Sequence, residues 1–141
     1  MSQKILLKNG LIINGTGNPG FYGSVFVENN KLSVIRNNSD SIEADIIVDC
    51  KDKIISPGFI DLHSHTGLTI FGEPEHKPKV FQGVTTELIG IDGISPVPFK
   101  NKSELERYIW LDSGLNDYPP APPDWLKTLE YLDKVDNNVA I

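Results

Sequence analysis

Short apolar runs separated by polar and turn-forming residues dominate the first third of the chain. Two such runs flank Lys8-Asn9-Gly10, a group typical of a turn, and two more precede Pro57. They predict strands over 5–7, 11–13, 46–48 and 54–55. Between them, alternating runs at 24–28 and 31–35 surround Asn29-Asn30. Because asparagine tolerates positive φ, this pair predicts a hairpin turn. Residues 1–56 are therefore expected to form a small all-β domain.

From Pro57 onward the pattern changes to strands that alternate with helices. Strands are predicted over 59–65 and 84–91, with a short helix over 78–82 between them that starts at a proline and stops before Gly83. This order is typical of a parallel sheet wound with helices, an α/β arrangement. A closed barrel of this type needs about 250 residues, so residues 57–141 predict only the start of one, the front end of a longer protein.

Two longer helices are predicted in the last third. Ser103 and Glu106 have the spacing of a capping box and place a helix start there. Asp124 is expected to cap a helix with an apolar face made of Trp125, Leu129, Leu132 and Val135. The proline-rich stretch 118–123 predicts a stiff connector, and 139–141 begins a further apolar run.

Composition excludes several classes of protein. Among 141 residues, 39% are hydrophobic and the net charge is −6, which indicates a globular chain without a basic surface for nucleic acid or anionic membranes. A single cysteine, Cys50, excludes an intramolecular disulfide and is interpreted as a small buried residue. The apolar run near Met1 is too short for a signal peptide or a membrane span, so the cytoplasm is the expected compartment.

His63 and His65 are the strongest candidates for chemistry. In a strand they project from the same face, so two imidazoles converge at the strand's C-terminal end. Neutral imidazole is a common ligand of zinc and related ions, which predicts a metal site. The alternative is a buried strand that carries two polar residues by chance, an arrangement that would leave them expensively unsatisfied.

Other polar residues carry weaker predictions. Asp61 shares a face with both histidines and is expected to orient one of them or to anchor the strand. His76 lies among charged loop residues and is expected to be solvated. Ser64 and Ser95 have no histidine and aspartate placed to activate them, so covalent serine catalysis is not supported.

The segment 57–65, with the sequence PGFIDLHSH, resembles the first barrel strand of the amidohydrolase superfamily. The segments 82–87, 90–96 and 138–140 resemble the N-acyl-D-amino-acid deacylase (D-aminoacylase) branch. The resemblance implies a small β-sandwich-type domain over 1–56 followed by a TIM-like (β/α)8 barrel that starts in 57–141. It also implies a divalent metal, zinc being the expected one, as one or two ions. The implied activity is hydrolysis of the amide of an N-acyl-D-amino acid by a metal-activated water.

One position departs from that family pattern. Many members have Asn-Cys-Gly after the second strand, with the cysteine as a metal ligand, whereas this chain has Ile91-Asp92-Gly93. Asp92 is therefore predicted as the third ligand beside His63 and His65, an anionic but harder one that discriminates less strongly for zinc. The alternative is that Asp92 is only a turn residue before Gly93.

Two further functions stay open. One is another amidohydrolase that acts on cyclic amides, of the hydantoinase or dihydroorotase type; the other is a non-catalytic truncated remnant. The resemblance places the general base beyond residue 141, so the 141-residue chain alone is expected to be inactive. The expected partner is a small-molecule N-acyl amino acid, with no nucleic acid and no membrane.

Overall fold

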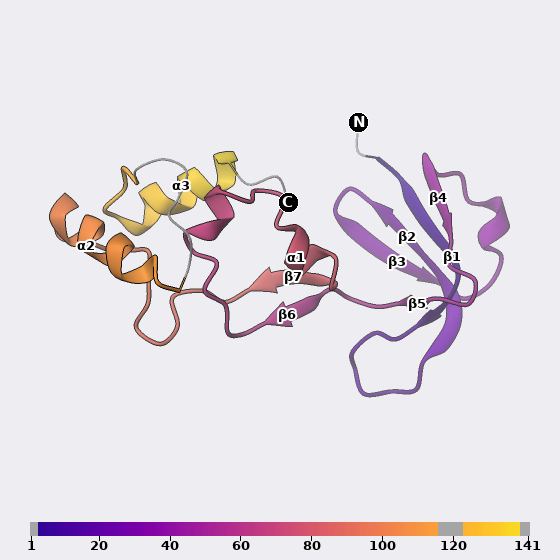
Figure 1. Cartoon of the computed structure of the whole chain (residues 1–141). Helices are drawn as coiled ribbons and strands as arrows, with labels where there is room; N and C mark the ends of the chain where they lie inside the picture. Colours follow the sequence, from indigo (N-terminus) through magenta and orange to yellow (C-terminus); the bar gives the residue numbers. More distant parts are fainter. Residues whose placement is uncertain (1–2, 116–122, 139–141) are drawn as a thin grey trace. The chain divides into compact units, whose positions relative to one another are not determined.

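The computed structural model describes residues 3–115 and 123–138 and divides into two units, Met1–Pro57 and Gly58–Ile141 (Figure 1). Most of the predicted connector, 118–122, and the predicted apolar run over 139–141 lie outside the described residues. No helix in the described ranges is both long and apolar enough to cross a membrane.

The first unit is built around one mixed sheet. Its strands run in the order β3-β2-β1-β4, and β5 also pairs with β1. The strand β1 pairs antiparallel with β2 and parallel with β4 and β5. The bounds are β1 Ile5–Ile12, β2 Phe21–Glu28, β3 Lys31–Ile35, β4 Ile46–Asp49 and β5 Ile54–Ile55, with a short 3₁₀ turn, η1, at Ser39–Ser41.

The predicted hairpin is confirmed. β2 and β3 pair antiparallel with Glu28 opposite Lys31, which leaves Asn29 and Asn30 as the two-residue loop. Both asparagines have positive φ, 51° and 59°. This backbone has the left-handed geometry that matches the twist of the flanking strands, and asparagine adopts it at little cost.

The prediction of two strands separated by a turn at Lys8-Asn9-Gly10 is wrong. These residues lie inside the single strand β1, where the register to β2 shifts between Leu7 and Gly10. One extra residue is accommodated there, with Asn9 at a φ of 63°. The feature is therefore a β-bulge, which uses the same residue types as a turn but bends the strand without reversing it.

The buried side chains of the first unit come from both faces of the sheet, because Leu6 lies opposite Phe26 whereas Val25 lies opposite Leu7. The fully or nearly buried side chains are Leu6, Ile12, Val25 and Cys50. Burial of Cys50 among apolar side chains agrees with its interpretation as a small packing residue.

The second unit begins with a parallel strand pair, as predicted. β6 (Phe59–Asp61) pairs parallel with β7 (Val84–Glu87), and α1 (Lys77–Val80) lies between them in the chain. Both strands are shorter than predicted: β6 ends two residues before His63. The approach of β6 to β7 depends on Gly58, because a Cβ there would lie 2.0 Å from Oγ1 of Thr85.

The predicted capping box at Ser103 and Glu106 is wrong by two residues. Helix α2 spans Lys102–Asp112, and its N-cap is Asn101, whose side-chain oxygen accepts a hydrogen bond from the Glu104 backbone N–H at 3.0 Å. The Glu104 carboxylate in turn accepts from the Lys100 N–H at 3.2 Å. Asn101 therefore caps a free N–H of the first turn, and the helix begins before Ser103.

The prediction for the last helix is wrong in its cap and in part of its apolar face: Val135 packs against the core as expected, whereas Leu129 and Leu132 are exposed. Helix α3 spans Thr128–Asn138, after Asp124, which instead pairs with Lys134 at 2.9 Å. Leu129 is 79% exposed, whereas Tyr131 is 3% exposed and faces the core. Trp125 is buried, but it precedes the helix.

The core of the second unit holds the chain segments that follow the candidate ligands. It contains Leu68, Leu105, Ile109, Trp125 and Tyr131. The Tyr131 hydroxyl donates to the Gly67 carbonyl at 2.8 Å, and the Trp125 indole N–H donates to the Pro96 carbonyl at 2.9 Å. Burial raises the pKa of Tyr131 to about 12, so its hydroxyl stays a donor at neutral pH. The core thus anchors the loop after His65 and the loop after Asp92.

Candidate metal centre

Both candidate histidines lie just beyond the end of β6. β6 ends at Asp61, so His63 and His65 lie in the segment that follows it and not within the strand. Their alternation nevertheless brings the rings close, with centroids 5.5 Å apart and planes at 63°. The predicted convergence of two imidazoles is therefore present on an irregular segment.

Asp92 reaches the histidines from the loop after β7. Asp92 and Gly93 both have positive φ, 55° and 74°, and the Ile94 N–H donates to the Ile91 carbonyl at 2.8 Å. Asp92 therefore occupies a tight turn, which was the alternative considered for it. The turn also directs its carboxylate to the histidines, so the turn and ligand roles are compatible.

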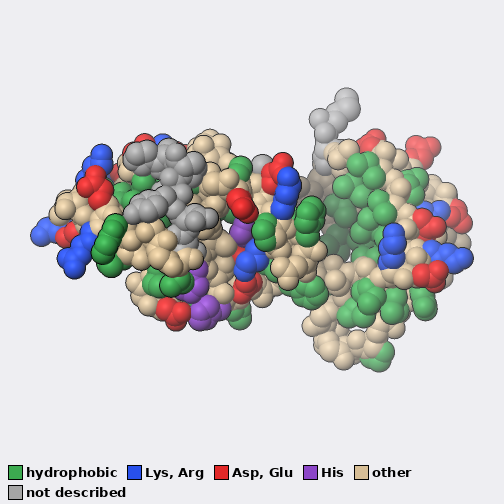
Figure 2. Space-filling model, viewed as in Figure 1, with side chains coloured by type: hydrophobic (Ala, Val, Ile, Leu, Met, Phe, Trp, Pro, Cys, Tyr) green, Lys and Arg blue, Asp and Glu red, His purple; other side chains and the backbone are tan. Residues whose placement is uncertain are grey.

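The three side chains form a compact donor set. Oδ2 of Asp92 lies 3.0 Å from Nε2 of His63 and 3.7 Å from Nε2 of His65, and the three ligand atoms all lie within 4.8 Å of one another. His63 and Asp92 are 66% and 57% exposed, whereas His65 is 24% exposed. Figure 2 shows purple histidine side chains beside a red acidic group on this face of the second unit.

The donor set fits a divalent ion. Bonds of about 2.1 Å in a tetrahedral zinc site separate neighbouring ligand atoms by about 3.4 Å, and the distances from Asp92 Oδ2 to the two histidine nitrogens lie on either side of this value. Two imidazole nitrogens and one carboxylate oxygen suit zinc, manganese or iron. The exposure of His63 and Asp92 leaves room for water or a substrate beside the ion.

Among the described residues, one ring nitrogen of His65 is an unsatisfied polar atom. Its Nδ1 is buried and, within the described part of the chain, has no hydrogen-bond partner. A buried group of this kind costs about 1–3 kcal/mol. Ligand histidines usually donate their second ring nitrogen to an acceptor, so His65 departs from that pattern.

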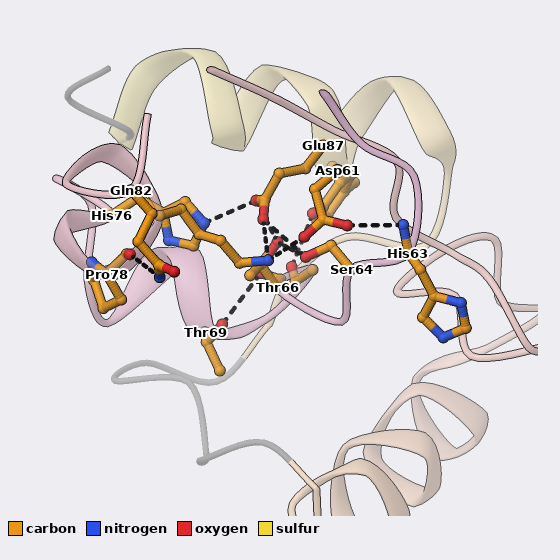
Figure 3. A network of polar contacts seen from close by, with 12 residues as sticks. Asp61, His63, Ser64, Thr66, Thr69, His76, Pro78, Gln82 and Glu87 are labelled. Atoms are coloured by element: carbon orange, nitrogen blue, oxygen red, sulfur yellow. Dashed lines mark hydrogen bonds and ion pairs between the residues drawn. The ribbon is translucent and has the colours of Figure 1, made fainter. Parts of the chain in front are cut away.

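A second group of polar side chains lies next to the histidine segment, and sequence reasoning missed most of it (Figure 3). Its centre is Glu87, the last residue of β7. The Glu87 carboxylate accepts hydrogen bonds from Ser64 Oγ at 2.9 Å and from Thr66 Oγ1 at 2.9 Å. It also contacts His76 Nε2 at 2.8 Å and Lys79 Nζ at 3.0 Å.

Asp61 belongs to the same group. One carboxylate oxygen accepts from the His63 backbone N–H at 3.0 Å, and the other pairs with Lys79. The hydrogen bond from Lys79, followed by the one from His63, holds the pKa of Asp61 below its usual range. Asp61 therefore contacts the backbone of His63 and not its ring.

The charges of the group stabilise one another. Hydrogen bonds to Asp61 and then Glu87 raise the pKa of Lys79. Burial alone would raise the pKa of Glu87, but hydrogen bonds from Lys79, Thr66 and Ser64 outweigh it and hold that pKa below its usual range. The Lys79 ammonium thus lies between two ionised carboxylates.

The expectation that His76 is solvated is wrong. His76 is 8% exposed and bonds to Glu87, because the left-handed backbone at His76 (φ 45°) turns it inward at the start of α1. One sequence signal could have revealed the group: Asp61 and Glu87 end neighbouring parallel strands, and two such carboxylates require a cation between them.

No family model matches the chain. Similar proteins are nevertheless known. The D-aminoacylase of Alcaligenes xylosoxydans xylosoxydans is 32% identical over 122 residues, which are 86% of this chain and 22% of that protein. The N-acyl-D-glutamate deacylase of the same organism is 32% identical over 100 residues, 70% of this chain and 20% of that protein. The chain thus spans about a fifth of the length of these relatives.

A solved structure agrees with these relatives. The structure of N-acyl-D-glutamate deacylase from Bordetella bronchiseptica, in complex with zinc and a phosphonate that mimics the tetrahedral intermediate, superposes with a TM-score of 0.75 at 25% identity. The superposition covers 98% of this chain and 27% of that one.

Proposed function

Since this chain is a homologue of D-aminoacylase and N-acyl-D-glutamate deacylase, enzymes of the amidohydrolase superfamily, we propose that it forms the N-terminal part of a metal-dependent hydrolase. The proposed substrates are N-acyl-D-amino acids, cleaved at the amide bond. The observation that carries the proposal is the convergence of His63, His65 and Asp92 within 4.8 Å.

In this proposal the three side chains are ligands in a centre of one or two divalent ions, with zinc as the first candidate. A bound ion of this kind lowers the pKa of a water molecule and polarises a carbonyl oxygen. His63 and His65 supply neutral nitrogen donors, and Asp92 supplies the negative charge. Because Asp92 offers oxygen in place of thiolate sulfur, the site is expected to accept manganese or iron more readily than a cysteine site.

We also propose a division of the chain into a β domain over 1–56 and the start of a TIM-like barrel over 57–141. The parallel pair β6–β7 with α1 between the strands supports the barrel. Ligands at the C-terminal ends of neighbouring parallel strands match the place where such barrels carry their sites. The cytoplasm stays a prediction, based on the short apolar run near Met1.

The test is hydrolysis by the protein that carries this chain. N-acetyl-D-amino acids, their L-enantiomers and hydantoins are offered in parallel, and release of the free amino acid is measured. The proposal predicts release from the D-substrates only, loss of release on chelation, and recovery with zinc. The variant His63→Ala should lower release at least tenfold, with Asp133→Ala on α3 as the exposed control. Hydantoin opening without D-amide hydrolysis would overturn the substrate assignment.

A further inference from the structure

We propose that Glu87 is a positioning residue for the metal centre: it braces the segment that carries His63 and His65, and so sets how tightly the ion is held. The inference rests on the proposed function. Glu87 is not one of the three donor side chains, and the function proposed above does not use it.

The first observation is that Glu87 holds the chain on both sides of His65. Its Oε1 accepts from the Ser64 hydroxyl at 2.9 Å, and its Oε2 accepts from the Thr66 hydroxyl at 2.9 Å. Ser64 is 2% exposed, so little water competes for its hydroxyl. One carboxylate therefore fixes both neighbours of a candidate ligand.

The second observation is that the backbone after β7 holds the chain on both sides of His63. The Leu88 N–H donates to the Asp61 carbonyl at 2.8 Å, and the Ser64 N–H donates to the Leu88 carbonyl at 3.1 Å. Leu88 directly follows Glu87. The residue that braces His65 by its side chain thus adjoins the residue that holds the His63 segment by its backbone.

The third observation concerns charge. Glu87 and Asp61 end paired strands, and Lys79 from α1 contacts both carboxylates. The side chains are 13%, 27% and 25% exposed, so solvent screens them only in part. Lys79 keeps both carboxylates ionised, and an ionised carboxylate is the stronger acceptor for the two hydroxyls.

The fourth observation is the direction of the side chains. Figure 3 shows the imidazole of His63 turned away from the cluster while its backbone N–H faces Asp61. The cluster therefore acts on the segment and not on the rings. A segment fixed in this way loses less conformational freedom when it binds an ion. Mutation of residues that hold metal ligands in place typically lowers metal affinity 10–100-fold.

The test measures zinc affinity of the full chain by competition with a chromogenic chelator. Glu87→Gln removes the negative charge and one acceptor while preserving shape, and should weaken zinc binding about tenfold. The double variant Ser64→Ala with Thr66→Val leaves the Glu87–Lys79 pair intact and should weaken it similarly. Glu130→Gln, which alters the acceptor at the start of α3, is the matched control and should bind as wild type.

A second readout separates positioning from stability. In the cobalt-loaded chain, the visible absorption of the ion reports ligand geometry, and it should change in Glu87→Gln and in the double variant but not in Glu130→Gln. A lower melting temperature with unchanged zinc affinity and unchanged cobalt spectrum would overturn the inference. If Glu87→Gln does not fold, the double variant decides by the same criteria.

The variant His63→Ala distinguishes the two proposals. If His63→Ala weakens zinc binding while Glu87→Gln and the double variant bind as wild type, the positioning role is overturned and the metal site stands. If His63→Ala binds zinc as tightly as wild type, the proposed metal site fails, and the positioning role fails with it.

Discussion

At the scale of single residues, the Glu87 carboxyl makes the stability of the fold depend on pH. Its pKa is lowered in the folded chain because hydrogen bonds from Lys79, Thr66 and Ser64 outweigh the effect of burial. A depressed carboxyl pKa stabilises the fold at pH values above the unfolded pKa, about 4.3 for glutamate. That contribution is lost as the pH falls through the lower folded pKa. Acid should therefore weaken this part of the fold.

The expected result is a melting temperature that falls between pH 5 and more acidic values, with a smaller fall in Glu87→Gln, which has no carboxyl to protonate. Thermal melts of both proteins from about pH 7 to about pH 3 check it. Glu130→Gln cannot serve as the control for this measurement. The Leu126 and Lys127 N–H groups lower the pKa of Glu130 as well, so its removal also changes the pH dependence of stability. Equal pH profiles for wild type and Glu87→Gln would contradict the account.

Sequence reasoning at the residue scale placed His63 and His65 correctly relative to each other because their alternation is local. It could also relate Asp92 to them, since the ends of neighbouring parallel strands meet. The sequence did not predict the grouping of His76, Lys79 and Glu87, because it depends on the path of the chain between the strands. A left-handed residue at His76 sets that path, and composition does not reveal it.

At the element scale, the cap of α2 offers a direct comparison of two sequence patterns. Asn101 caps the helix in the structure, whereas Ser103 lies within its first turn. Asn101→Ala should therefore lower the free energy of unfolding by about 1 kcal/mol, and Ser103→Ala should change it by less than about 0.5 kcal/mol. Urea denaturation of the two variants checks this. A larger loss of unfolding free energy in Ser103→Ala than in Asn101→Ala would contradict this and support Ser103 as the N-cap.

The elements show which local signals are reliable. The Asn29-Asn30 hairpin could be predicted because its loop length and residue types select one turn. The bulge at Asn9 could not, because a turn and a bulge use the same residues and only the partner strand distinguishes them. The face of α3 was misassigned because Trp125, the strongest apolar signal, is buried before the helix begins.

At the scale of the whole molecule, apolar side chains are exposed on the parallel pair β6–β7 and on the residues that directly follow β6, α1 and β7. Each of the following is more than half exposed: Phe59, Ile60, Leu62, Phe81 and Leu88. A two-stranded sheet with exposed apolar groups is marginal in water and offers strand edges for pairing. Contiguous exposed apolar groups of this kind favour association with another chain or element.

The 141-residue chain is therefore expected to self-associate in a concentration-dependent way. Light scattering across a dilution series measures it. The double variant Phe59→Lys with Ile60→Lys should shift the population toward monomer, whereas Leu129→Lys on α3 should not. A wild-type chain that stays monomeric at every concentration and melts cooperatively would contradict this expectation.

The most direct test of the central claim, that His63, His65 and Asp92 hold one ion, is X-ray absorption at the zinc edge. The zinc-loaded wild type should show only nitrogen and oxygen neighbours near 2.0–2.1 Å, with the outer scattering of imidazole rings. Asp92→Cys should add one sulfur neighbour at about 2.3 Å while the imidazole scattering remains. A spectrum of Asp92→Cys without sulfur, and identical to wild type, would remove Asp92 from the site and contradict the account.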